Sequence, residues 1–422
     1  MSLTRIAWRY LWARPVVTSL TLLGVILGAG LISGVLHLRR AVETAFVRES
    51  ATFDLVVGAK GSPLQLVLSS IYWIDDATGT IDYDEVESLA SRREVSSAVP
   101  IAVGDGYRGF RIVGTERSFF DLKRRDDEGR LTSPLATLDS GELFDSSFEA
   151  VLGAEVARAT QLKIGESFVS AHGVSDVSIP GQDHDESPFR VVGLLNPQGS
   201  PVDRAIFVSL DSVWEIHEHH EEEESEHPGE DEEHEEEEHE HRKVSSVLVQ
   251  LKIPSANARV ADEIGQSPDL LAAIPMQEMF RLKLQLLDPL ETALLALGAI
   301  VVVVAILSVA TTIAQSAERR RRELAIARSL GASRSEILAL VGLEAGILSF
   351  LGVAIGYVVG HASLAVAQNS GARRLGVTFD AWQWNPLEAW ALLAVFVAAC
   401  IAGSVPAFIA YRRSPVMDLE LQ

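Results

Sequence analysis

The residues of this chain with the greatest capacity for chemistry lie in one acidic stretch, residues 215–241. It holds seven of the 11 histidines and sixteen aspartate or glutamate residues, with no lysine or arginine. Imidazole is a preferred ligand of Zn²⁺, Cu²⁺ and Ni²⁺, and carboxylates add negative charge. No spacing in the stretch supplies the four fixed ligands of a closed zinc site. We therefore predict several exchangeable metal sites of modest affinity, weakened when imidazole is protonated, from His217, His219, His220, His227, His234, His239 and His241.

The same stretch has a second interpretation, as a solvated acidic loop without a specific partner. Its low-complexity sequence cannot bury an apolar core, so we expect a disordered, exposed loop in the absence of metal. It also accounts for most of the net charge of −22, because the chain without these sixteen acids carries −6. The acidity is therefore local. It gives no evidence for a basic partner, and no nucleic-acid partner is predicted.

Enzyme motifs are missing from the sequence. There is no G-x-x-x-x-G-K-[ST] phosphate-binding loop, no H-E-x-x-H zinc motif and no G-x-S-x-G nucleophile motif. His172, Asp183, His184 and Asp185 lie close together in sequence, and chance placement in a solvated loop explains them. The chain is therefore predicted not to be an enzyme and to have no catalytic residues.

Apolar runs indicate a membrane protein. Four of them reach the roughly 20 residues needed to cross a bilayer, and the mean hydropathy of the chain is +0.18. We place the spans at 16–38, 289–317, 337–367 and 389–411. The single cysteine, Cys400, lies in the last of these, so the rest of the chain folds without an internal disulfide.

Arginine placement predicts the topology. Residues 1–15 carry three arginines beside Trp8 and Trp12, as in an interfacial amphipathic helix. Six arginines follow in 318–336 and two more in the tail 412–422. The positive-inside rule places all three segments in the cytoplasm of a plasma (inner) membrane protein. The loop 368–388 and the long segment 39–288 then lie outside.

The 39–288 segment is predicted to be an α+β extracytoplasmic domain. Short apolar runs between glycine and proline residues indicate strands, and two stretches suit helices. The predicted strands are 53–57, 110–113, 189–195, 205–208 and 246–251, and the predicted helices are 84–92 and 150–161.

The basic segment between the second and third spans shows helix signals. Leu324, Ala327 and Leu330 recur as on one helix face that ends at Gly331. Ser333 and Glu336 have capping-box spacing for the next helix. Two interpretations follow: a loop whose charge only sets topology, or a docking helix for a cytoplasmic partner. Glu344 lies just inside the third span, where we expect a structural role, at the interface or paired with an arginine of this segment.

Three stretches resemble one known family. Residues 320–333, RRRELAIARSLGAS, resemble the coupling segment of FtsX/MacB-type ABC transporter permeases, "RRxEhAhhRxhGA". Residues 150–169, AVLGAEVARATQLKIGESFV, resemble the MacB-like periplasmic core pattern "hLGxxhAxxLxhxxGDxh", with Glu166 where the family often has aspartate. Residues 189–195 and 204–208 resemble the closing strands of that domain. The likeness covers nearly the whole chain except the acidic stretch.

The resemblance implies a four-span helical permease subunit with a MacB-like α+β periplasmic core. It implies a homodimer or a pseudo-symmetric pair that works with a separate ABC ATPase, which holds ATP and Mg²⁺ and drives movement of the outer domain (mechanotransmission). Efflux or export, an FtsX-like regulatory transmitter acting on a periplasmic or outer-membrane partner, a lipoprotein-releasing permease and a zinc-linked system remain open. The implied ATPase-coupling residues are Arg319, Arg320, Arg321, Arg322, Glu323, Leu324, Arg328, Leu330, Gly331 and Ala332.

Glycines recur in the third span, mostly at intervals of four residues. Small residues let helices pack closely in lipid. This pattern suits either dimerisation through the spans or packing within one subunit, with Gly342, Gly346, Gly352, Gly356 and Gly360 as the contributing positions.

Overall fold

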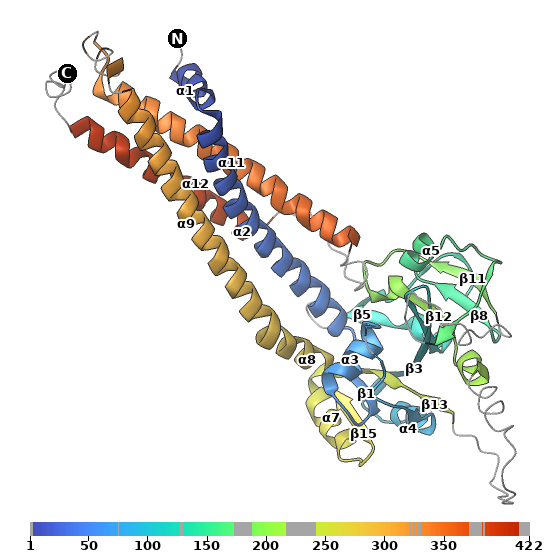
Figure 1. Cartoon of the computed structure of the whole chain (residues 1–422). Helices are drawn as coiled ribbons and strands as arrows, with labels where there is room; N and C mark the ends of the chain where they lie inside the picture. Colours follow the sequence, from blue (N-terminus) through green and yellow to red (C-terminus); the bar gives the residue numbers. More distant parts are fainter. Residues whose placement is uncertain are drawn as a thin grey trace, which may run out of the picture. The chain divides into compact units, whose positions relative to one another are not determined.

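A computed structural model describes the chain in two compact units (Figure 1). The helical unit comprises residues 1–42, 284–370 and 380–422, and the inserted domain comprises 43–283 and 371–379. The residues described are 3–74, 76–125, 130–172, 188–216, 242–320, 322–323, 326, 329, 331–370, 382 and 385–412. All seven histidines of the acidic stretch lie outside these ranges, as do Asp183, His184, Asp185, Arg321, Leu324, Arg328 and Leu330.

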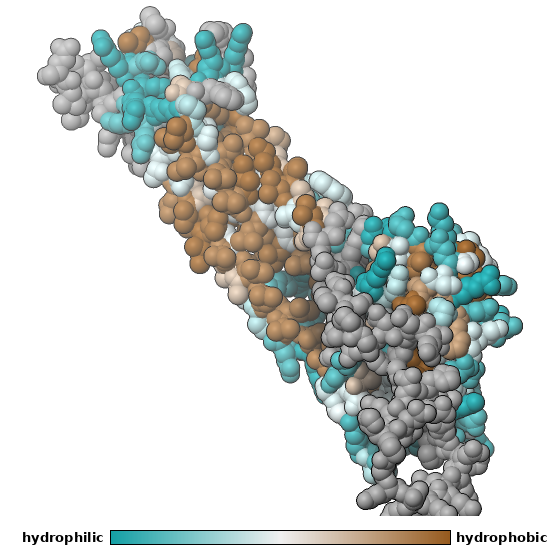
Figure 2. Space-filling view, turned by 45° about the vertical axis from the view of Figure 1, so that its right-hand side comes forward, coloured by the Kyte–Doolittle hydropathy of each residue, from teal (hydrophilic) through white to brown (hydrophobic). Residues whose placement is uncertain are grey.

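Among the described residues, the helical unit contains one short helix and four long ones. The short helix is α1 (Leu3–Trp12), and the long ones are α2 (Pro15–Ser50), α9 (Asp288–Arg319), α11 (Arg334–Ser370) and α12 (Pro386–Arg412). Within the part of the chain that the structure describes, four stretches are long and apolar enough to cross a membrane: Pro15–Arg40, Pro275–Arg319, Ser335–Gln368 and Pro386–Val405. Figure 2 shows the resulting hydrophobic surface, in brown, over the long helices. The predicted class of four-span helical membrane protein is confirmed.

Glycines of α11 bring it close to α2. A Cβ on Gly352 would lie 2.5 Å from Val25 Cγ1, one on Gly356 would lie 2.8 Å from the Ile26 carbonyl oxygen, and one on Gly360 would lie 2.8 Å from the Gly30 carbonyl oxygen. At Gly356 and Gly360 the atoms approached are backbone oxygens, so a residue without a Cβ is needed for this close helix packing. At these three positions the small-residue pattern therefore serves packing within one chain.

The inserted domain has an 11-stranded mixed sheet at its centre. Two strand pairs are parallel, β12 with β4 and β11 with β8, and the other pairs are antiparallel. The strand order is β15 (Leu270–Ala273), β1 (Leu55–Ala59), β14 (Ser246–Leu251), β3 (Val95–Tyr107), β4 (Phe110–Thr115), β12 (Ala205–Ser209), β8 (Glu149–Leu152), β11 (Phe189–Leu195) and β7 (Leu138–Gly141), with β10 (Ala171–His172) on β3 and β9 (Ser167–Phe168) on β11.

Short helices and minor strands complete the domain. The helices whose bounds are described include α3 (Pro63–Ile71), α4 (Asp84–Ala90), α5 (Ala154–Thr160), α7 (Asn257–Gly265) and α8 (Pro275–Leu282). The minor strands pair as β13 (Lys243–Val244) with β2 (Ile81–Asp82) and β5 (Lys123–Arg125) with β6 (Leu131–Pro134).

Both faces of the sheet are covered, as β1 illustrates. Val56 packs in one apolar cluster with Leu66, whereas Leu55 and Val57 pack in a second cluster with Leu89. Successive side chains of a strand point to opposite faces, so a continuous apolar run indicates a strand buried on both sides. This explains why such runs in the sequence predicted strands correctly.

The predicted strands agree closely with the structure, and one predicted helix is partly wrong. Residues 189–195 and 246–251 form β11 and β14, and the other three predicted strands overlap β1, β4 and β12. The predicted helix 150–161 begins too early, because Ala150–Leu152 belong to β8 and only Ala154–Thr160 is helical. Gly153 separates the two elements: a Cβ there would lie 2.5 Å from the carbonyl oxygens of Val202 and Asp203.

Two buried ion pairs connect the C-terminal part of α2 and the residues after it to β5. Arg124 Nη1 donates to Glu49 Oε1 at 2.5 Å, with both side chains at most 6% exposed. Arg125 Nη2 donates to Asp54 Oδ2 at 2.7 Å, and Asp54 Oδ2 also accepts from the Leu251 backbone N–H at 2.6 Å. The chain is thus fixed within the domain just after the first membrane helix.

Candidate functional site

The basic segment lies between the end of α9 at Arg319 and the start of α11 at Arg334. Among its described residues, Arg319, Arg322, Glu323 and Ile326 are exposed, and Ile326 is a large apolar side chain with 48% of its surface accessible. An exposed isoleucine among arginines suits contact with another protein, since buried apolar anchors with charged surroundings are typical of interfaces.

Two of the helix signals predicted for the segment, the glycine stop and the capping box, are present in the structure, whereas the predicted apolar face of Leu324, Ala327 and Leu330 lies outside the described residues. Gly331 has a φ of +104°, a backbone conformation that favours glycine. Glu336 Oε2 accepts from the Ser333 backbone N–H at 2.7 Å, and the Glu336 N–H donates to Ser333 Oγ at 3.3 Å. This reciprocal pair is the predicted capping box, so the turn between the two helices has a defined geometry.

Arg320 differs from its neighbours, because its guanidinium group points to other helices. Arg320 Nη2 donates to Glu344 Oε2 at 2.7 Å and to Oε1 at 3.0 Å, and Ser316 Oγ donates to Glu344 Oε1 at 3.1 Å. The guanidinium carbon lies 3.9 Å from the centre of the Tyr10 ring. The side chains of Arg320 and Glu344 are 11% and 4% exposed.

This arrangement fastens three helices together beside the basic segment. Tyr10 comes from α1, Ser316 lies on α9, and Glu344 lies on α11. Of the two positions expected for Glu344, the structure shows the pairing with an arginine. These contacts can hold the helices together, and none of them is a catalytic arrangement. The contact of the exposed residues with an ATPase stays a prediction.

Two family models match the chain. The MacB-like periplasmic core domain matches residues 18–267, which is more than half of the sequence, and the FtsX-like permease C-terminal domain matches residues 295–416. The chain belongs to the FtsX/MacB-like permease family. It is therefore a permease-family membrane protein with an extracytoplasmic domain.

Individual relatives are distant. An uncharacterized ABC transporter permease of Methanocaldococcus jannaschii is 24% identical over 243 residues, which cover 56% of this chain and 55% of that protein. The chain thus spans about half the length of this curated relative.

Two solved structures share little sequence with the chain. The extracellular domain of the ABC-type transporter YknZ from Gram-positive bacteria is 12% identical with a TM-score of 0.28, covering 52% of this chain and 98% of that one. The periplasmic region of MacB from Actinobacillus actinomycetemcomitans is 11% identical with a TM-score of 0.32, covering 54% and 92%. The family assignment rests on the sequence models.

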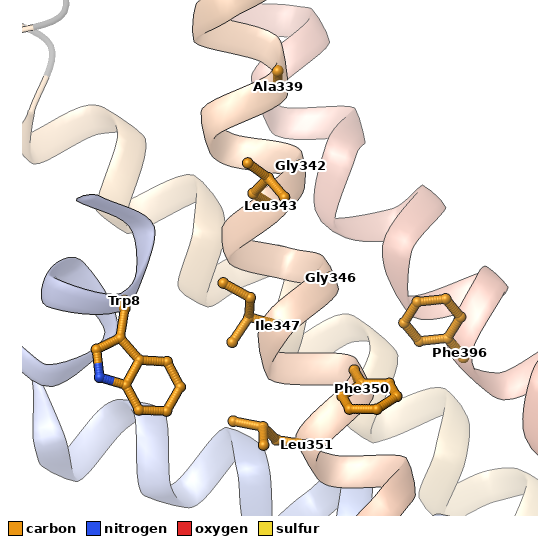
Figure 3. Close-up of a pocket in the computed structure, with 9 residues that line it drawn as sticks. All are labelled: Trp8, Ala339, Gly342, Leu343, Gly346, Ile347, Phe350, Leu351 and Phe396. Atoms are coloured by element: carbon orange, nitrogen blue, oxygen red, sulfur yellow. The ribbon is translucent and has the colours of Figure 1, made fainter. Parts of the chain in front are cut away.

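The permease has an apolar groove of about 760 Å³ in its helical unit. Figure 3 shows Trp8 of α1 on one side, Phe396 of α12 on the other, and α11 between them. No described atom lies within 4 Å of the position that a Gly346 Cβ would take, unlike at Gly352, Gly356 and Gly360. This stretch of α11 is therefore open to an apolar ligand or to another helix. The lining residues are Trp8, Ala339, Gly342, Leu343, Gly346, Ile347, Phe350, Leu351 and Phe396.

The helical unit also contains a second buried polar cluster, which was not predicted from the sequence. His37, His361 and Glu388 are all buried in the helical unit. Glu388 was assigned to an outer loop, yet α12 already begins at Pro386. The available signal was one histidine in each of two apolar helices, because ionisable residues inside spans are rare and usually functional.

Proposed function

We propose that this permease transmits the work of a separate ATPase to its extracytoplasmic domain. The observation that carries the proposal is the Arg320–Glu344 pair beside the exposed basic segment. Because that pair joins α9 to α11, a partner that displaces the segment would move two membrane helices together. The exposed face for docking would be Arg319, Arg322, Glu323 and Ile326, with Gly331 and Ala332 shaping the turn.

Helix continuity supports transmission to the outer domain. The chain leaves the helical unit through α2, a single helix from Pro15 to Ser50. It returns through one helical stretch from Pro275 to Arg319, which includes a π-helical turn at Lys283–Leu287. Helices transmit displacement better than flexible loops do. In this proposal both termini and the basic segment are cytoplasmic, as the arginine distribution favours.

Docking is testable with one apolar side chain. Replacing Ile326 with aspartate should weaken ATPase association about 30-fold, the effect of losing an interface residue of roughly 2 kcal/mol. The tagged full chain would be purified from host membranes, and the co-purifying polypeptide with a G-x-x-x-x-G-K-[ST] motif would be identified and titrated back.

The matched control introduces the same substitution in the other unit. Ile253 in the inserted domain is 64% exposed, so Ile253→Asp should leave ATPase association unchanged. Equal ATPase binding by Ile326→Asp and the unmodified chain would overturn docking at this segment, and so would the absence of any co-purifying ATPase.

The apolar groove favours a second candidate function, movement of a lipid-anchored or amphipathic cargo such as a lipoprotein. Its lining is apolar, apart from the indole nitrogen of Trp8. Such a groove can hold an acyl chain by burial of apolar surface alone. A permease that only switches a partner protein would not need such a groove. Protection of a cysteine-reactive probe at Leu343→Cys by added lipoprotein would support cargo binding, and equal labelling with and without lipoprotein would count against it.

The open face of α11 also bears on the proposed homodimer. If a second copy packs on Gly342 and Gly346, a Gly346→Cys chain that also carries Cys400→Ser should form a disulfide-linked dimer on mild oxidation. Ser349→Cys with Cys400→Ser, at a position of α11 that is fully buried within the chain, is the matched control and should remain monomeric. Monomers from both variants would argue against pairing through this face.

The metal link of the acidic stretch remains a proposal based on composition. Several exchangeable sites would release Zn²⁺ to a chelator and would bind less as the histidines become protonated. Changing all seven histidines to asparagine should remove this exchangeable fraction of bound zinc. An unchanged fraction would leave the stretch as a solvated insertion.

A further inference from the structure

The helical unit contains a buried group of metal-ligand side chains that come from three helices. His37 lies on α2, His361 on α11 and Glu388 on α12, and they are 2%, 0% and 2% exposed. One ring nitrogen from each histidine and one oxygen of Glu388 lie within 4.8 Å of one another. Ionisable groups are costly inside a membrane span, so three of them in contact call for a function.

The hydrogen bonds of His361 leave one ring nitrogen available. Its Nδ1 lies 3.0 Å from the Tyr357 carbonyl oxygen, 3.4 Å from Ser33 Oγ and 3.6 Å from Glu388 Oε1. A proton on Nδ1 suits the Tyr357 carbonyl, which can only accept. Nε2 is then an acceptor, and it is buried with no hydrogen-bond partner among the described residues. A backbone carbonyl that fixes one nitrogen while the other is left free is typical of a metal-ligating histidine.

The neighbours of the group hold it in place. Ser33 Oγ donates a short hydrogen bond to Glu388 Oε1. The rings of Tyr357 and Trp382 lie 4.1 Å and 5.4 Å from the His361 ring, centre to centre. A Cβ on Gly360 would lie 3.0 Å from Ser33 Oγ, so the close approach of α2 and α11 is what brings Ser33 and His37 to His361.

We propose that His37, His361 and Glu388 bind one divalent transition-metal ion of the zinc class. Two neutral imidazoles and one carboxylate carry a single negative charge, which a divalent cation offsets. Two histidines and one glutamate form a known zinc ligand set that leaves a fourth position open, and nitrogen donors favour zinc, copper or nickel over magnesium or calcium.

The ligand atoms need to converge slightly to hold such an ion. Zinc–ligand distances of about 2.0–2.1 Å in a tetrahedron place ligand atoms about 3.4 Å apart. The present spacing of up to 4.8 Å requires shifts of about 1 Å in side-chain position, which rotation of χ angles supplies. The bound ion would cross-link α2, α11 and α12. This site is distinct from the acidic stretch and does not depend on ATPase docking.

Metal retention by the full chain tests the site. The chain is purified in detergent, incubated with Zn²⁺, dialysed against EDTA and assayed for zinc by mass spectrometry. A buried three-ligand site should retain about one zinc per chain, because slow release from the helix interior outlasts the dialysis. His361→Ala and Glu388→Gln should each lower the retained zinc at least tenfold.

Two variants separate the outcomes. A chain with all seven histidines of residues 217–241 changed to asparagine should retain its zinc, and His361→Cys should retain it too, because thiolate is also a zinc ligand. Monodisperse gel filtration establishes that the variants are folded, and Co²⁺ substitution should give tetrahedral visible bands in the unmodified chain but not in Glu388→Gln. If the unmodified chain retains no more zinc than His361→Ala does, the three residues form only a hydrogen-bonded histidine–glutamate group. Loss of retained zinc in the seven-histidine variant would assign the metal to the acidic stretch. Either result overturns the proposal and leaves ATPase docking untouched.

Discussion

Replacing Glu344 with alanine should destabilise the helical unit by about 3–5 kcal/mol, because it leaves the charge of Arg320 buried without its carboxylate. The Arg320 side chain is only 11% exposed, and its remaining contacts would be Ser316 and the Tyr10 ring. The measurement is chemical unfolding of the full chain in detergent micelles. In the proposed mechanism, ATP hydrolysis by the assembled complex should also lose its coupling to the permease.

The control for Glu344→Ala is an ion pair nearer the solvent. Arg39 and Glu291 lie 3.0 Å apart, and the Arg39 side chain is 42% exposed, so Glu291→Ala should cost no more than about 1 kcal/mol. The double variant Arg320→Met, Glu344→Met should recover much of the stability, since neutral apolar residues remove the uncompensated charge. An equal loss of stability in Glu344→Ala and Glu291→Ala would contradict this account.

Local signals were sufficient for part of the candidate site. Gly331, Ser333 and Glu336 act within one turn of the chain, so their spacing alone predicted the helix stop and the capping box. The strands β11 and β14 were predicted for a similar reason, because an apolar run that is buried on both faces is visible in the sequence itself.

The roles of the four consecutive arginines could not be separated from sequence. Arg319 and Arg320 are neighbours of the same type, yet one is exposed and the other is paired with Glu344. The difference comes from the rotation of α9, which places Ser316 and Arg320 on one face, and from the position of α11 beside it. Periodicity in a helix that is apolar on all sides does not indicate which face meets a neighbour.

The histidine–glutamate group illustrates the same limit over longer distances. Ser33 of α2 and Glu388 of α12 are 355 positions apart in the chain, and the third member, His361, reaches Ser33 because glycines let α2 and α11 approach. The sequence showed the glycines but left open whether they serve one chain or two. The structure assigns Gly352, Gly356 and Gly360 to packing within the chain, whereas Gly346 faces the open groove.

Replacing Arg124 with alanine should destabilise the extracytoplasmic domain by about 3–5 kcal/mol, because the cation that faces the buried carboxylate of Glu49 is removed. Both side chains are at most 6% exposed, and Arg124 also donates to the Leu135 carbonyl oxygen at 3.3 Å. Unfolding of the full chain, followed by the fluorescence of Trp73 and Trp214 in this domain, would measure the loss.

The matched control is the same substitution at an exposed pair in the same unit. Arg117 and Asp145 lie 2.6 Å apart with side chains 58% and 83% exposed, so Arg117→Ala should change stability by at most about 1 kcal/mol.

The comparison also bears on transmission, because Glu49 lies at the end of the helix that enters the domain, whereas Arg117 does not. If the end of α2 drives the domain through Glu49, Arg124→Ala should also weaken any ATP-dependent change in domain conformation, measured by protease sensitivity. If Arg124→Ala loses stability but keeps the ATP-dependent change in domain conformation, the Arg124–Glu49 pair serves folding alone. If Arg124→Ala loses no more stability than Arg117→Ala, leaving the Glu49 carboxylate buried without its arginine is not costly.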